Sequence, residues 1–184
     1  MESAPTQSPR ILVAGIGNIF LGDDAFGSEV AQRLLRLPQR DGVTVIDFGI
    51  RGLDLMYALG DGFDAAILID AVPRGEVPGT LFVLEPLLDE DAAEVACPIL
   101  EAHSMDPLKV LRAVASSGTL PARTLIVGCQ PAPLSDEDEM QMEISPPVRA
   151  AIDEAVAMVQ EIVAGYLADQ RAKLDVVHSQ ELPC

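Results

Sequence analysis

Residues 65–71 of this 184-residue chain read Ala-Ala-Ile-Leu-Ile-Asp-Ala, an apolar run interrupted by one charge, Asp70. Five successive apolar residues without polar alternation are typical of a parallel strand that is covered on both faces of its sheet. Parallel strands need crossover connections, which are usually helices. The stretch therefore predicts the centre of an α/β domain.

Strand and helix patterns alternate on both sides of this run, as an α/β domain requires. Upstream we predict strands at 11–15 and 43–48 and helices at 29–37 and 53–59. Downstream we predict strands at 80–84 and 124–128, a helix at 106–115 and a long amphipathic helix that begins at Ser145-Pro146-Pro147. The predicted fold is a three-layer α/β domain, with a mostly parallel five-stranded sheet flanked by helices on both faces.

The ends of the chain are polar, and its length suits one domain with one core. We predict a disordered N-terminal tail at residues 1–10, a single α/β domain at 11–168, and a polar, disordered C-terminal tail at 169–184.

Charge and cysteine usage exclude several classes of protein. Twelve basic against 29 acidic residues give a formal charge of −17, which repels nucleic acid and anionic lipid. No apolar stretch reaches the roughly 18 residues of a membrane span. Cys97, Cys129 and Cys184 form no C-x-x-C pair, so neither a zinc ribbon nor a disulfide scaffold is indicated. We expect a cytoplasmic, reduced, monomeric protein.

Acidic residues follow two of the predicted strands. Asp23 and Asp24 lie in the glycine-containing segment after the first strand, and Asp70 ends the third. Ligands of open α/β sheets bind beyond the carboxyl ends of the strands, where the strand order reverses. If the first and third strands are neighbours, Asp24 and Asp70 face the same crevice.

His103 is the third candidate, because it directly precedes a predicted helix, whereas the other histidine, His178, falls in the predicted tail. Two carboxylates and one imidazole suit a divalent metal such as nickel, zinc, manganese or cobalt, and three ligands leave positions open to a substrate. Structural roles stay open: helix capping for Asp24, a loop hydrogen bond for Asp70, and an ordinary loop position for His103.

Three other kinds of site fit the sequence less well. For a dinucleotide site, the third glycine after Gly15-x-Gly17 would fall at Phe20, and the acidic pair would repel a pyrophosphate. For a receiver-type regulatory domain, the acidic pair stands eight residues too late and no lysine follows the fifth strand. For a cysteine hydrolase with Cys129 as nucleophile, nothing nearby indicates an activated thiolate.

Several motifs together resemble the endopeptidases that mature the large subunit of nickel–iron hydrogenases. The most specific is Gly15-x-Gly17-Asn18-x-x-x-Gly22-Asp23-Asp24-x-x-Gly27. The others are Asp47-Phe48-Gly49-Ile50-Arg51-Gly52, Leu68-Ile69-Asp70-Ala71, Ala102-His103 and Gly128-Cys129-Gln130-Pro131.

This resemblance implies an aspartic-type endopeptidase that activates a hydrogenase by processing it. Asp24, Asp70 and His103 would be both the catalytic and the metal-recognition residues. The metal implied is nickel, already loaded in the partner, the hydrogenase large-subunit precursor, whose C-terminal extension is removed. Phe48 and Arg51 depart from the glycine- and threonine-rich loop of many relatives, which leaves the choice of hydrogenase open. A nickel-binding maturation chaperone without protease activity is the alternative function.

Overall fold

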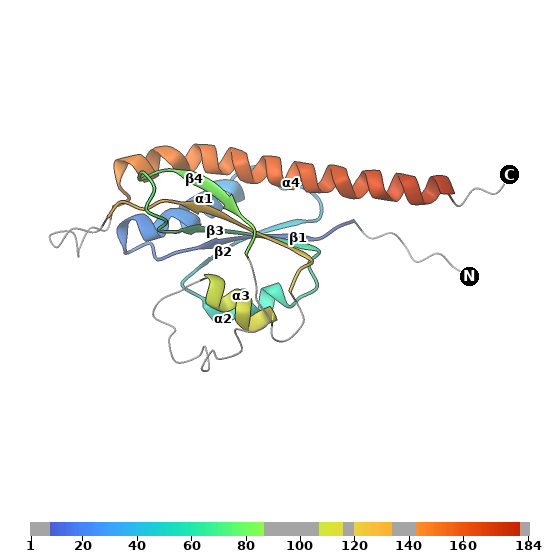
Figure 1. Cartoon of the computed structure of the whole chain (residues 1–184), viewed down its shortest axis with the longest axis horizontal. Helices are drawn as coiled ribbons and strands as arrows, with labels where there is room; N and C mark the ends of the chain where they lie inside the picture. The colour runs from blue at the N-terminus through green and yellow to red at the C-terminus, as the bar shows by residue number, and fades with distance from the viewer. Residues whose placement is uncertain (1–7, 87–106, 116–119, 134–142, 181–184) are drawn as a thin grey trace.

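The computed structural model describes residues 8–86, 107–115, 120–133 and 143–180. Its centre is a five-stranded sheet with the order β2-β1-β3-β5-β4 (Figure 1). The strands are β1 (Ile11–Ile16), β2 (Val43–Gly49), β3 (Ala65–Ala71), β4 (Leu81–Leu84) and β5 (Arg123–Cys129). Only β4, at one edge, is antiparallel to its neighbour. The predicted mostly parallel sheet is confirmed, with β3 at its middle.

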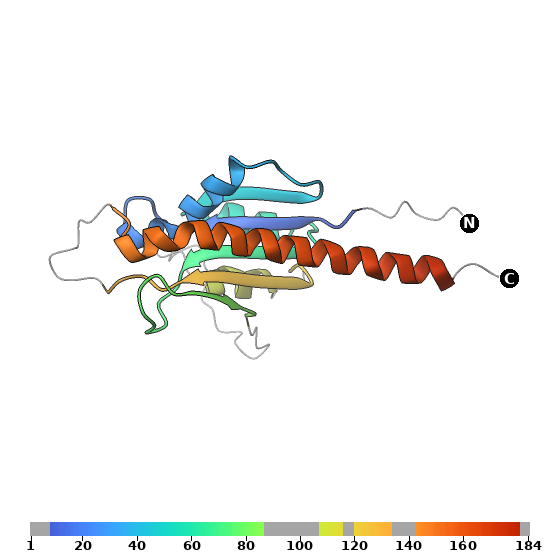
Figure 2. The same ribbon diagram turned by 90° about the horizontal axis from the view of Figure 1, so that it is seen from above.

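Helices cover both faces of this sheet, as predicted (Figures 1 and 2). One face carries α1 (Phe26–Leu35) and α4 (Pro146–Gln180), and the other carries α2 (Gly52–Leu59) and α3 (Pro107–Ala115). The strand order also excludes the receiver-type alternative, because receiver sheets have the order 2-1-3-4-5 with all strands parallel. None of the helices in the described ranges is long and apolar enough to span a membrane.

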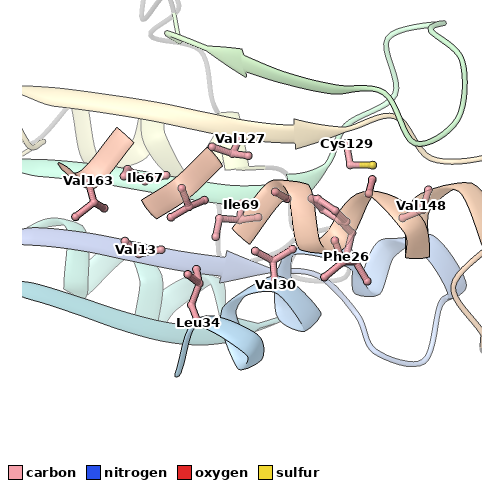
Figure 3. Close-up of a cluster of buried hydrophobic side chains, with 14 of the residues drawn as sticks. Val13, Phe26, Val30, Leu34, Ile67, Ile69, Val127, Cys129, Val148 and Val163 are labelled. Atoms are coloured by element: carbon pink, nitrogen blue, oxygen red, sulfur yellow. The ribbon is translucent and has the colours of Figure 1, made fainter. Parts of the chain in front are cut away.

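Alternate residues of the inner strands feed two separate cores, which explains why these strands lack polar alternation. In β3, Ile67 and Ile69 pack with the α1 and α4 side, whereas Leu68 packs with the α2 and α3 side. Figure 3 shows the first of these cores, where Ile69 lies among side chains from the sheet, α1 and α4. Because side chains alternate along a strand, Asp70 shares the α2 and α3 face with Leu68.

Helix α1 begins at Phe26, three residues earlier than the sequence predicts. Its first turn lies directly on two strand ends: a Cβ added to Gly27 would stand 2.0 Å from the carbonyl oxygen of Ile69 and 2.2 Å from that of Ile16. Only glycine permits this approach of helix backbone to strand backbone. Gly27 thus fixes the start of α1 over the carboxyl ends of β1 and β3.

The C-terminal end of the described chain differs from the prediction. Helix α4 continues through residues 169–180, where we predicted a disordered tail, and extends past the sheet (Figure 1). This stretch contains no glycine or proline, and adding residues to an existing helix avoids the cost of a new nucleus. Asp169, Arg171 and Lys173 are exposed, so polar residues here face solvent within a continuing helix. Residues 181–184 lie outside the described ranges.

The N-terminal end is fixed one residue before the first strand, although the sequence places residue 10 in a tail. The backbone N–H of Arg10 donates to Asp64 Oδ2 at 2.7 Å. The guanidinium of Arg10 lies 4.6 Å from the centre of the Phe63 ring. Both contacts hold the chain against the segment that enters β3. Residues 1–7 lie outside the described ranges.

Candidate functional site

The strand order reverses between β1 and β3, since β2 continues the sheet on one side of this pair and β5 on the other. Gly15 and Ile69 are partners in the parallel register, so both strands end at the same edge. Asp70 stands at that end of β3 and is 5% exposed. This junction is the place where ligands of such sheets bind, and it confirms the predicted neighbourhood of the first and third strands.

Asp24 reaches the same junction through the glycines around it. It lies in a short 3₁₀ helix, η1 (Gly22–Ala25), between β1 and α1. Gly17 has φ +143°, and a Cβ there would stand 1.8 Å from the carbonyl oxygen of Asp24. Gly17 therefore allows the Asp24 backbone to lie against the end of β1, while Gly27 seats the following turn on β3. Gly17 and Gly27 are therefore needed for close packing of the backbone in this segment, and not only for a tight turn.

The carboxylate of Asp24 does not cap a helix. Its Oδ2 accepts a hydrogen bond from the backbone N–H of Asn18 at 2.9 Å, and Asn18 Oδ1 accepts one from Phe20 N–H at 3.0 Å. No side-chain cap is present at the start of η1 or of α1, so the capping interpretation is wrong. In the part of the chain that the structure describes, no hydrogen bond is found to Asp24 Oδ1. The Asp24 residue is exposed.

Asp23 has a different role from its neighbour, which the sequence did not reveal. Its Oδ2 accepts hydrogen bonds from Ala132 N–H at 2.8 Å and from the Ser145 hydroxyl at 2.9 Å. Its Oδ1 accepts one from Ser145 N–H at 2.7 Å. The two adjacent acids thus have different roles. Asp23 joins η1 to the segment after β5 and to the start of α4, whereas Asp24 is not used in this connection and can interact with a ligand.

Cys129 does not provide a nucleophile. Its side chain is fully buried, and burial raises the pKa of the thiol to about 12, with the charge of Asp23 acting in the same direction. A hydrogen bond with the Gly79 backbone opposes this shift only in part. The reactive species of a cysteine enzyme is the thiolate, so the cysteine hydrolase interpretation is excluded.

The residue after it, Gln130, is also structural. Its side-chain Oε1 accepts hydrogen bonds from the backbone N–H groups of Arg74 at 2.6 Å and Glu76 at 3.2 Å. Gln130 is buried and ties the connection between β3 and β4 to the end of β5. The Gly128-Cys129-Gln130-Pro131 motif therefore has a structural role at the carboxyl end of β5, the strand that pairs with β3 beside Asp70.

Phe48 and Arg51, the two unusual residues of the Asp47–Gly52 loop, both interact within the protein. Phe48 is 3% exposed and belongs to the core under α2. Arg51 Nε donates to the Phe48 carbonyl oxygen at 3.1 Å, which closes the loop on itself. Asp47 accepts hydrogen bonds from Gly49 N–H at 3.1 Å and from the Gln32 side chain at 3.0 Å. Ile50 is the large apolar residue of this loop that is exposed, at 58%.

The predicted three-residue metal site is described only in part. The structure brings Asp24 and Asp70 to one edge of the sheet, but His103 lies outside the described residues. Within the described ranges, no group of three or more His, Cys, Asp or Glu side chains is placed to hold a metal ion.

Comparisons with known proteins agree on one family. The family model "HycI: Hydrogenase maturation protease" matches residues 28–162. The chain is 36% identical over 169 residues to the hydrogenase expression/formation protein HupM of Azotobacter chroococcum, covering 89% of this chain and 77% of that protein. It is 32% identical over 152 residues to the hydrogenase 2 maturation protease of Escherichia coli, covering 82% and 88%.

Solved structures give the same result. The structure of the hydrogenase maturating endopeptidase HybD from E. coli superposes with a TM-score of 0.66 at 29% identity, covering 85% of this chain and 93% of that one. A hydrogenase 2 maturation peptidase from a Thaumarchaeota archaeon superposes with a TM-score of 0.63 at 31% identity, covering 84% and 98%. The α/β fold, the sequence and the matched model together show that this chain is a peptide-bond hydrolase that belongs to the hydrogenase maturation protease family.

Proposed function

We propose that this protease removes the C-terminal extension from the nickel-loaded precursor of a nickel–iron hydrogenase large subunit. Asp24, Asp70 and His103 act in this reaction as catalytic residues and as ligands that recognise the nickel of the substrate. The observation that carries the proposal is that Asp70 ends β3 and Asp24 follows β1, the parallel neighbour of β3, so both residues belong to the carboxyl edge at the switch point of the sheet.

Asp24 suits contact with a metal that arrives with the substrate. Its Oδ2 is fixed by the Asn18 N–H, so the orientation of the carboxylate is set before the substrate binds. The residue is exposed, so a substrate metal can approach it from solvent. Carboxylate oxygen is a ligand for divalent metals of this class, and a preset ligand loses less conformational freedom on binding.

Asp70 supplies a second carboxylate with a different environment. It is buried at the end of the central strand and lies on the α2 and α3 face. Its neighbour in the register, Gly128, has no side chain on that face, and the ring of Phe82 fills the space where a Cβ would stand. Burial at the end of this packed strand limits the freedom of the Asp70 side chain, as a positioned general base or metal ligand requires.

The position of His103 in the chain supports its membership of this set. It precedes the start of α3 at Pro107 by four residues, and α3 packs on the same face as Asp70. Helix α3 leads into β5, a parallel strand. His103 therefore precedes a helix that packs on the same face of the sheet as Asp70.

Two routes to hydrolysis use these residues. The substrate's nickel polarises the scissile carbonyl or activates the attacking water, or Asp24 or Asp70 takes the proton of that water while nickel serves as the recognition signal. In both, water adds across the peptide bond to give a new carboxylate and a free amine. Replacing nickel in the precursor by zinc separates the routes, because the cleavage rate follows the metal's Lewis acidity only in the first.

The decisive experiment compares nickel-loaded and nickel-free large-subunit precursor incubated with this protein, with the product mass as the readout. We expect the nickel-loaded precursor to lose one defined C-terminal peptide and the nickel-free precursor to keep its full mass. Equal processing of both forms would refute nickel recognition. Binding of the nickel-loaded precursor without any shortening would favour the non-proteolytic chaperone.

A further inference from the structure

Large apolar side chains gather on the surface beside the candidate site. Six of the ten large apolar residues that are exposed in the described part of the chain lie in the two turns after β1 and β2 and along α2. They are 48% to 73% exposed. We call this set the apolar rim: Ile19, Phe20, Leu21, Ile50, Leu53 and Tyr57.

The backbone holds the parts of the apolar rim together. Gly17 N–H donates to the Gly49 carbonyl oxygen at 3.1 Å, so the turn after β1 lies beside the turn after β2. Leu53 and Tyr57 are four residues apart on α2 and therefore share one side of that helix. The rim thus forms one region across the ends of β1 and β2 and down the adjoining helix.

The first part of the rim is held rigidly. Leu21 N–H donates to the Asn18 carbonyl oxygen and Asp24 N–H donates to the Leu21 carbonyl oxygen, both at 3.0 Å. The side chain of Asn18 accepts from Phe20 N–H. An isolated exposed apolar residue needs no explanation, but a hydrogen-bonded turn that displays three in succession beside a reactive edge marks an interaction site.

We propose that the apolar rim is the docking surface for an apolar segment of the substrate polypeptide next to the bond that is cut. This inference rests on the proposed function. The carboxylate of Asp24 accepts the Asn18 N–H at the base of the same turn, so the rim and the candidate catalytic residue are parts of one turn. An endopeptidase must hold the chain beside its scissile bond, and the rim is the apolar surface that adjoins Asp24.

The charge of the protein argues against other occupants. With a formal charge of −17, a second copy of the chain and an anionic bilayer are both repelled. A polypeptide segment of apolar, uncharged or basic character meets no such repulsion. The rim therefore fits a protein partner that differs in charge from this chain.

The test measures precursor binding apart from cleavage. Fluorescence anisotropy of labelled, nickel-loaded large-subunit precursor is titrated with wild-type protein and with the double variant Phe20→Ser/Leu53→Ser, and cleavage in the same samples is followed by mass. Leu35→Ser is the matched control, because Leu35 is 46% exposed at the end of α1, away from the carboxyl edge. Circular dichroism checks that all three proteins are folded.

We expect the double variant to bind more than tenfold more weakly, because exposed aromatic and apolar anchors dominate such contacts, with Leu35→Ser within twofold of wild type. If the folded double variant binds the precursor as tightly as the wild type, the rim is not the docking surface, even if the wild type cleaves the precursor. Binding through the rim without cleavage by the wild type overturns the proposed function and keeps the docking surface. Two further results would assign the rim to another occupant and overturn the proposal. One is a dimer in sedimentation, and the other is binding to phosphatidylcholine–phosphatidylserine vesicles, if either is lost in the double variant.

Discussion

Asp23 and Ser145 are 122 residues apart in the chain, yet Ser145 donates two hydrogen bonds to the carboxylate of Asp23, from its backbone N–H at 2.7 Å and its hydroxyl at 2.9 Å. Ser145 stands directly before α4, the longest helix, and Asp23 stands directly before Asp24. The pair therefore connects the turn that carries the candidate site to the helix that covers one face of the sheet.

We expect Asp23→Asn to lower the free energy of unfolding by about 2 kcal/mol, because an amide NH₂ would replace one acceptor that now faces hydrogen-bond donors. Ser145→Ala removes only the hydroxyl donor and should cost about 1 kcal/mol. Urea denaturation followed by circular dichroism measures both. A fully stable Asp23→Asn protein would contradict this structural role of Asp23.

The close approach of α1 to the strand ends makes Gly27 intolerant of a side chain. Gly27→Ala places a Cβ 2.0 Å from the Ile69 carbonyl oxygen and 2.2 Å from that of Ile16, so we expect the free energy of unfolding to fall by about 3 kcal/mol or more. Gly165→Ala is the matched control, since nothing lies within 4 Å of its added Cβ in α4. That variant should gain about 0.5 to 1 kcal/mol. Equal melting temperatures for the two would contradict the packing of α1 on β1 and β3.

The candidate catalytic residues are tested by substitutions that preserve structure. Asp24→Asn keeps a side-chain oxygen for the Asn18 N–H, so the turn should persist while the negative charge is lost. We expect a fall of about 10²-fold or more in precursor cleavage for this variant, and likewise for Asp70→Asn and His103→Ala. Mass spectrometry of the precursor over time gives the rates.

The control for this series is Glu154→Gln, which removes an exposed carboxylate from α4, outside the candidate site. It should cleave at the wild-type rate. If His103 binds the substrate's nickel, wild-type activity should also fall on acidification, because only the neutral imidazole is a ligand. Full cleavage by folded Asp24→Asn and His103→Ala proteins would mean that the site lies elsewhere.

Cys129 should be dispensable for cleavage and visible in the alkaline stability of the protein. The thiol ionises near 9.0 when unfolded and near 12 when folded. Between these values the unfolded state binds fewer protons, so the free energy of unfolding falls as the pH rises. Cys129→Ala removes this contribution and should flatten the decline, although its lost volume costs about 1 kcal/mol at neutral pH.

Denaturation of both proteins between pH 8 and about pH 11 measures this difference, with precursor cleavage as the second readout. Burial also raises the pKa of Tyr166, but that group is common to wild type and variant and cancels in the comparison. Loss of cleavage in a folded Cys129→Ala protein would restore the thiol as a participant.

Local sequence determined most of the elements. The unbroken apolar run of β3 predicted a strand buried on both faces, and Asp70 at its end predicted a polar group at the carboxyl edge. Both follow from the two-residue period of a strand and the common direction of parallel strands. The alternation of strand and helix patterns along the chain predicted the three-layer arrangement of the fold. The predicted site of Asp24, Asp70 and His103 stays a prediction.

Tertiary structure decided what depends on contacts between distant segments. The hydrogen bonds that give Asp23 its structural role could not be predicted from the sequence, because its partners lie more than 100 residues away. Likewise, no local pattern says that Phe48 is buried while Phe20 is exposed. The period of a helix or strand predicts which face of that element a side chain occupies. What covers that face is decided only when the sheet order brings other elements beside it, and this is why the apolar rim and the Asp23–Ser145 connection became visible only in the folded chain.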